Sequence, residues 1–69
     1  MMNEKIRIVL IKRGMSMRDL AKLLGTSPQN LNDKLHRDNF KEADLIKIAA
    51  ALNCKYTVSF TMNDTGEIV

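Results

Sequence analysis

The side chains best suited to recognition chemistry cluster between positions 29 and 37 of this 69-residue sequence. If this segment is a helix with Leu31 and Leu35 inward, a rotation of about 100° per residue turns a polar arc outward. Glutamine and asparagine can each form paired hydrogen bonds with N6 and N7 of adenine, and aspartate can accept one from N4 of cytosine. All five side chains of this arc can form hydrogen bonds. The arc consists of Gln29, Asn30, Asp33, Arg37 and His36, the last interpreted as a surface or packing residue.

Covalent catalysis and metal binding find little support in the sequence. It contains one histidine, His36, one cysteine, Cys54, and no glycine-rich phosphate loop. Structural zinc takes about four Cys or His ligands, and nucleophilic catalysis needs a nucleophile beside a base. We therefore expect no enzymatic activity, no metal and no cofactor. Cys54 is interpreted as a small, buried apolar residue.

The basic excess lies in the first three quarters of the chain. The formal net charge is +3, and residues 1–53 hold ten basic and six acidic side chains, whereas residues 54–69 hold Lys55 against Asp64 and Glu67. Such an excess is compatible with a polyanionic partner. The apolar run Ile8–Ile11 is shorter than the roughly 7 to 15 residues of a secretory signal. We expect a cytoplasmic protein that does not associate with membranes.

Any exposed helix is polar on its outer face, so the polar arc alone does not indicate a binding surface. The elements that position it must be considered. The first of these is a helix over about residues 4–13, in which Ile6, Val9 and Leu10 follow the i, i+3, i+4 rule. Asn3 is its expected N-cap, and Gly14 lies just beyond its end.

Two further helices carry clear start and stop signals. Ser16 and Asp19 form a short-armed relative of the capping box, and Gly25 ends the helix that follows. Ser27 caps the next helix, and Pro28 takes its first position, where the missing N–H has no cost.

A fourth helix is expected from about Lys41 or Glu42 to Leu52, with Phe40 closing over the core ahead of it. Asn53 is expected to adopt the left-handed conformation that ends many helices. The inner face of this helix consists of Leu45, Ile48, Ala49 and Leu52.

After the fourth helix the period changes from that of a helix to that of a strand. Residues 55–62 alternate strictly between apolar and polar types, which predicts a half-buried β-strand. Residues 63–66 have turn chemistry, and residues 67–69 could return as a second, short strand. Because a lone strand is unstable, it must pair with this return, with the helical body, or with a second copy.

The segment Met17–Leu35, MRDLAKLLGTSPQNLNDKL, combines two short helices with a tight glycine turn. Ala21 is the small residue at the helix crossing, and Gly25 permits the reversal. This segment resembles the helix-turn-helix of the lambda-repressor and Cro-like family, also called the xenobiotic response element family. The likeness continues through LIKIAAALN in the fourth helix and covers roughly residues 3–53. The expected fold is mainly α: a four-helix domain over residues 1–53, followed by a β-strand or short hairpin over residues 54–69.

The resemblance implies sequence-specific binding of double-stranded DNA by a repressor-like transcriptional regulator, which would be nucleoid-associated when bound. The helix over about residues 28–36 would enter the major groove, and the helix before it would bridge the backbone. Base reading would fall to Pro28, Gln29, Asn30 and Asp33. Contacts to the DNA backbone would come from Met17, Arg18, Ser27, Arg37, Asn39 and Lys41.

The alternating segment leaves more than one interpretation open. It could join two copies into a homodimer through Tyr56, Val58, Phe60 and Met62, so that two reading helices meet half-sites about 34 Å apart. It could instead close as a hairpin on Ile68 and Val69. The alternative function is a protein-interaction module, such as an antitoxin or an adaptor, whose strand adds to the sheet of another protein.

Overall fold

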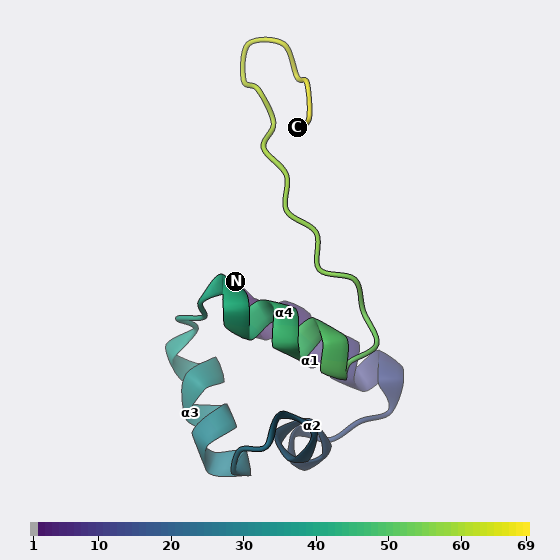
Figure 1. Cartoon of the computed structure of the whole chain (residues 1–69), viewed down its shortest axis with the longest axis vertical. Helices are drawn as coiled ribbons and strands as arrows, with labels where there is room; N and C mark the ends of the chain where they lie inside the picture. Colours follow the sequence, from purple (N-terminus) through teal and green to yellow (C-terminus); the bar gives the residue numbers. More distant parts are fainter. Residues whose placement is uncertain (1) are drawn as a thin grey trace.

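The computed structural model describes residues 2–69, which form four helices followed by an extended tail (Figure 1). The predicted helices are confirmed in number and order over these residues. We call residues 2–53 the helical body and residues 54–69 the tail. The helices are α1 (Met2–Arg13), α2 (Met17–Leu24), α3 (Pro28–Arg37) and α4 (Glu42–Ala51).

The capping signals around α2 are confirmed. The Ser16 hydroxyl accepts a hydrogen bond from the Asp19 N–H at 3.1 Å, and the Asp19 carboxylate accepts one from the Ser16 N–H at 2.9 Å. Gly25 ends the helix with φ of 72°. A non-glycine residue rarely adopts this conformation. The chain can therefore reverse within the few residues that separate α2 from α3.

The start of α3 also follows its signals. The Ser27 hydroxyl accepts a hydrogen bond from the Asn30 N–H at 3.1 Å, and Pro28 occupies the first turn. At the other end Asp38 adopts φ of 52° and closes the helix with hydrogen bonds from its N–H to the Lys34 and Leu35 carbonyls. The helix is thus bounded on both sides by residues close to it in sequence.

The first helix begins earlier than expected. It includes Met2, so the predicted start near residue 4 is wrong, and Asn3 lies inside the helix instead of capping it. The physical reason is a distant acceptor: the Asn3 N–H donates to Asp38 Oδ1 at 3.1 Å, and the Asn3 side chain accepts from the Glu4 N–H at 2.7 Å. A carboxylate near the N-terminus of a helix is electrostatically favourable.

The fourth helix ends at Ala51, one residue before the expected Leu52, and Asn53 adopts the predicted left-handed conformation with φ of 56°. The Cys54 N–H donates to the Ala49 carbonyl at 2.8 Å, and the Arg13 guanidinium donates to the Asn53 carbonyl at 3.0 Å. The latter bond ties the end of α1 to the end of α4.

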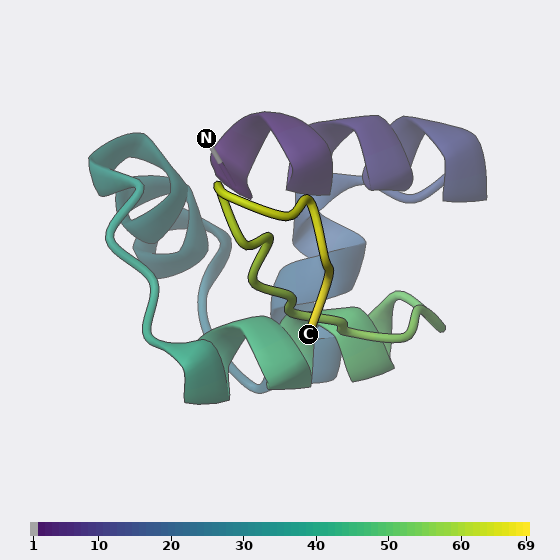
Figure 2. The same cartoon turned by 90° about the horizontal axis from the view of Figure 1, so that it is seen from above.

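The core lies between the four helices, and its buried residues recur with the helical period. Leu20, Ala21 and Leu35 are fully inaccessible. Phe40 packs against this core from the α3–α4 connection, as expected. Figure 2 shows α2 between α1 and α4, with α3 to one side. The buried residues are Ile6, Leu10, Leu20, Ala21, Leu31, Leu35, Ile48 and Leu52.

The predicted β-strand over residues 55–62 is wrong as a regular element, because residues 2–69 contain only an isolated antiparallel bridge between Thr61 and Ile68. Phe60 and Val69 exchange backbone hydrogen bonds of 3.0 and 2.8 Å around it. The hairpin interpretation is closer to this arrangement, and of the predicted turn residues 63–66, residues 63–65 form a turn. The return segment is only three residues long, so it pairs with only part of residues 55–62.

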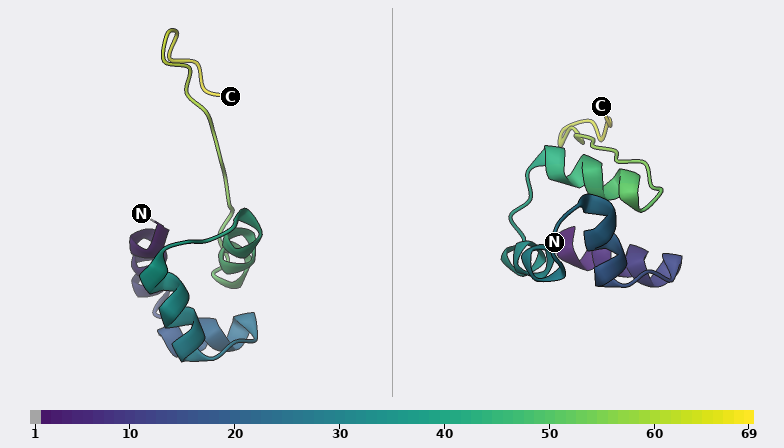
Figure 3. Two further views of the ribbon diagram at one scale, coloured as in Figure 1. Left: turned by 90° about the vertical axis from the view of Figure 1, so that its left-hand side faces the viewer. Right: turned by 60° about the horizontal axis from the view of Figure 1, so that its bottom comes forward.

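The tail projects from the end of α4 away from the helical body (Figures 1 and 3). It gives the molecule an elongated outline of 44 × 23 × 18 Å. Among the described residues no helix has the length and apolar character needed to cross a lipid bilayer.

Candidate nucleic-acid interface

The predicted reading face is an exposed surface of α3. Leu31 and Leu35 are buried, and the side chains on the opposite side of the helix are accessible. The four residues expected to read bases are all exposed: Pro28, Gln29, Asn30 and Asp33. By the helical period Gln29, Asn30 and Asp33 lie opposite the buried leucines, whereas Pro28 lies in the first turn on the side of Leu31.

The N-terminus of α3 carries the positive end of the helix dipole and is capped by Ser27. The Ser27 hydroxyl accepts a hydrogen bond from the Asn30 N–H, and the Ser27 carbonyl accepts one from the Leu31 N–H at 3.1 Å. The first-turn N–H groups of a helix lack acceptors within that helix, and the macrodipole favours negative charge beside them. An anion beside Ser27 and this turn would therefore be favoured, and Gln29 and Asn30 are exposed on the same turn.

Most of the residues expected to contact the DNA backbone are also exposed. Arg18 lies in the first turn of α2, Arg37 in the last turn of α3, and Asn39 and Lys41 in the connection to α4. Met17 differs, because it is half-buried and packs against the core. Only the accessible part of its side chain is available for a contact outside the protein.

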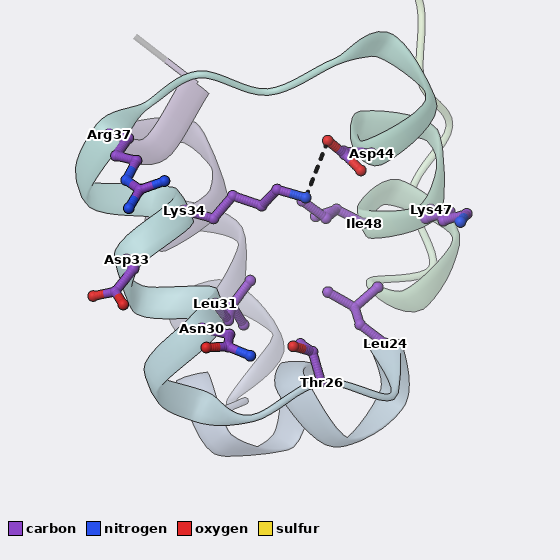
Figure 4. Close-up of a pocket in the computed structure, with 10 residues that line it drawn as sticks. All are labelled: Leu24, Thr26, Asn30, Leu31, Asp33, Lys34, Arg37, Asp44, Lys47 and Ile48. Atoms are coloured by element: carbon purple, nitrogen blue, oxygen red, sulfur yellow. Dashed lines mark ion pairs between the residues drawn. The ribbon is translucent and has the colours of Figure 1, made fainter.

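A groove of about 530 Å³ separates α3 from α4 (Figure 4). Leu24, Leu31 and Ile48 form its apolar part, and charged and polar side chains surround them. Asn30, Asp33 and Arg37 lie along the α3 side of this groove, whereas Pro28 and Gln29 do not line it. The groove also contains residues that the sequence did not single out for a site: Thr26, Lys34, Asp44 and Lys47.

An ion pair spans the groove. Lys34 Nζ lies 3.2 Å from Asp44 Oδ2, and Figure 4 shows the lysine side chain reaching from α3 toward α4. The other Asp44 contact is the Lys41 N–H, which donates to Oδ2 at 3.3 Å. The hydrogen bond from Lys34, followed by that from Lys41, holds the pKa of Asp44 below its ordinary value of 3.8.

A second carboxylate is stabilised at the start of α2. Hydrogen bonds from the Ser16 backbone, and then from its side chain, lower the pKa of Asp19 from 3.8. Both carboxylates therefore remain charged at neutral pH, each beside the N-terminus of a helix, where negative charge is favourable.

The tail presents the side chains expected at a dimer interface, largely accessible to solvent. Tyr56 and Val58 line a second groove, of about 500 Å³, against Ile46 and the neighbouring residues of α4. Phe60 is 75% exposed and Met62 is 47% exposed near the tip of the tail.

Cys54 is half-buried, packs against the core, and donates a hydrogen bond from Sγ to the Leu52 carbonyl at 3.4 Å. Within residues 2–69 no three His, Cys, Asp or Glu side chains gather in a way that could hold a metal ion.

The sequence indicates the contact between Asp44 and Lys41, but not the ion pair between Asp44 and Lys34. Asp44 stands three residues after Lys41, the spacing from which a first-turn carboxylate reaches back to a capping position. That Lys34 pairs with this carboxylate depends on how α3 and α4 are placed in space. No local pattern in the sequence indicates it.

Comparison with known proteins identifies a family for most of the chain. The family model of the Cro/C1-type helix-turn-helix DNA-binding domain matches residues 5–57, which include most of α1 and all of α2, α3 and α4. The chain is 31% identical over 64 residues to "Repressor protein CI" of Enterobacteria phage phi80. The match covers 93% of this chain and 26% of that repressor, so the chain spans about a quarter of its length. No solved structure matches the chain significantly. The chain belongs to the Cro/C1-type helix-turn-helix DNA-binding domain family.

Proposed function

We propose that the helical body binds double-stranded DNA sequence-specifically, with α3 in the major groove. In this proposal Gln29 and Asn30 read base edges, Asp33 accepts from cytosine N4, and Pro28 sits against the bases at the entry of the helix. The observation that carries the proposal is the exposure of Gln29, Asn30 and Asp33 on the side of α3 opposite its buried leucines, in a chain of the Cro/C1-type family.

The same proposal assigns the DNA backbone to groups around that surface. Arg18, Arg37 and Lys41 supply positive charge from α2, from the end of α3 and from the start of α4. Phosphate contacts fix the register of a protein on the duplex, and base contacts then select the sequence. Further contacts to the backbone come from Met17, Ser27 and Asn39.

We further propose that the chain is a repressor-like transcriptional regulator that acts as a homodimer. The likeness to a phage repressor supports the regulatory role. The exposed apolar side chains of the tail support the dimer, since Val58 is 60% and Phe60 is 75% exposed. Tyr56, Val58, Phe60 and Met62 would then be covered by the tail of a second copy. A different protein on this surface would instead make the chain an antitoxin or adaptor.

Selection of bound duplexes from a random pool tests DNA binding directly. We expect one enriched sequence, present as two half-sites if the dimer binds. Affinity for that sequence should fall with salt, with a slope of log affinity against log salt of about −0.9 for each phosphate neutralised. Arg18, Arg37 and Lys41 together predict a slope of about −3 for each bound copy. A response that is flat in salt, or a pool without enrichment, would contradict the proposal.

A further inference from the structure

The reading helix is supported unevenly by the rest of the helical body. Among the described elements α2 packs closely against both α3 and α4, whereas α3 and α4 meet only marginally. The groove of about 530 Å³ lies between these two helices. The apolar core joins all four helices, and the groove leaves the flank of α3 that faces α4 partly open.

The ion pair between Lys34 and Asp44 crosses this open side. Its 3.2 Å separation joins the middle of α3 to the first turn of α4. At the end of α3, Asp38 Oδ1 accepts from the Asn3 N–H of α1 at 3.1 Å. Two polar links thus connect α3 to helices other than α2.

Both partners of the ion pair are directed toward one another. Asp44 also accepts from the Lys41 N–H, which orients its carboxylate. Lys34 follows Leu31 by three residues, so it lies on the flank of α3 and not on its outward arc. In Figure 4 its side chain extends toward α4, whereas Asp33 points away from the groove.

We propose that Lys34 and Asp44 are positioning residues that set the orientation of α3 relative to α4 and thereby its fit to DNA. This inference rests on the proposed DNA binding. In this role Lys34 is not a phosphate contact. Removing either partner leaves α3 free to tilt across the groove, and binding must then restore its orientation.

The expected effect is limited by the strength of the pair. The two side chains are 49% and 27% exposed, and exposed ion pairs are weak because solvent and salt screen them. A conformational equilibrium can shift only by the free energy of the interaction that biases it. The loss of DNA affinity should therefore be about two- to fivefold.

A double-mutant cycle with the selected duplex tests the inference. Lys34→Met keeps the length of the stem, and Asp44→Asn keeps an acceptor for the Lys41 N–H. Each single variant should bind about two- to fivefold more weakly, and the double variant should bind no more weakly than either one. Lys34→Arg, which retains the pair, should bind like the wild type. Lys47→Met is the matched control for charge, because Lys47 lines the same groove but points away from it in Figure 4.

The Asp44→Asn variant distinguishes positioning from charge, because the two effects change DNA affinity in opposite directions. It removes a negative charge, so by charge alone it should strengthen DNA binding, whereas loss of positioning weakens it. Unchanged or tighter binding by this variant would overturn the inference. A salt slope that is smaller in magnitude by about 0.9 in Lys34→Met would also overturn the inference, because that change is the signature of a lost phosphate contact. If the wild type binds no duplex, the proposed function fails as well, and an unfolding cycle on the free protein still tells whether the two residues are coupled.

Discussion

Gln29 and Asn30 are neighbours in the first turns of α3 and are both exposed. If they read bases, Gln29→Ala and Asn30→Ala should each lower the affinity for the selected sequence by about 1 to 3 kcal/mol. Affinity for unrelated duplexes should change little, because phosphate contacts supply it. Titration of labelled duplexes of both kinds measures the two effects.

The matched control is Asn32→Ala, an exposed amide of the same helix that lies outside the outward arc. It should leave both affinities close to those of the wild type. An equal loss for all duplexes in the Gln29 and Asn30 variants would show instead that these residues support the fold.

Asp19 and Asp44 make the stability of the helical body depend on pH. Both carboxylates have a pKa below 3.8, lowered chiefly by the hydrogen bonds from Ser16 and from Lys34, respectively. A group whose pKa is depressed by folding stabilises the protein above its unfolded pKa, and this contribution is lost as the pH falls through the folded value. We expect the urea midpoint to stay level above about pH 5 and to fall below about pH 4.

The Asp19→Asn, Asp44→Asn double variant tests the origin of this dependence. It should be less stable than the wild type at pH 7 and should lose less stability between pH 5 and pH 3. If the variant loses as much stability as the wild type between pH 5 and pH 3, other carboxylates cause the pH dependence.

Ala21 is the small side chain that the sequence predicts at the crossing of α2 and α3. Ala21 is fully buried, and α2 packs closely against α3. Ala21→Leu must displace the neighbouring helix and should lower the free energy of unfolding by about 1 to 3 kcal/mol. Urea unfolding followed by circular dichroism measures the change.

Ala43→Leu provides the comparison, since Ala43 is exposed in the first turn of α4. It should alter the free energy of unfolding by no more than about 0.5 kcal/mol. If the two leucine variants were equally stable, Ala21 would not be the close contact between α2 and α3.

The elements that could be predicted from sequence are those whose boundaries depend on nearby residues. Ser16 with Asp19, Ser27 with Pro28, and Gly25 each act within one turn, so the positions of α2 and α3 follow from local chemistry. The buried leucines followed from the helical period for the same reason. The exposed surface of α3 was predictable because the residues that bury one side leave the other to solvent.

The predictions that failed depend on residues far apart in sequence. The alternation over residues 55–62 indicates which side chains share a face, but a strand also needs a neighbour, and residues 67–69 supply only a short one. The early start of α1 depends on Asp38, 35 residues away. The pairing of Lys34 with Asp44 likewise required the arrangement of α3 and α4 in space.

At the scale of the whole molecule, the helical body and the tail differ in how much apolar surface they bury. The body has a buried core and leaves Ile8, Ile11 and Leu23 more than half exposed. The tail buries none of its apolar residues fully and leaves Val58, Phe60, Ile68 and Val69 more than half exposed. Exposed apolar groups on an extended backbone are typical of a surface that pairs with another chain. The tail is also the part that lies farthest from α3 in Figure 1. A second copy bound there would leave both reading helices accessible.

The dimer is tested by charging one side of the tail. We expect the wild-type mass in sedimentation equilibrium to rise from 7.8 kDa toward twice that value with concentration. Val58→Lys with Phe60→Lys should remain monomeric, because burying unpaired ammonium groups at the interface is strongly unfavourable. Thr57→Lys with Ser59→Lys adds the same charge on the alternate positions and should still dimerise. A monomeric wild type at every concentration would contradict the dimer and favour the short hairpin as the final state of the tail.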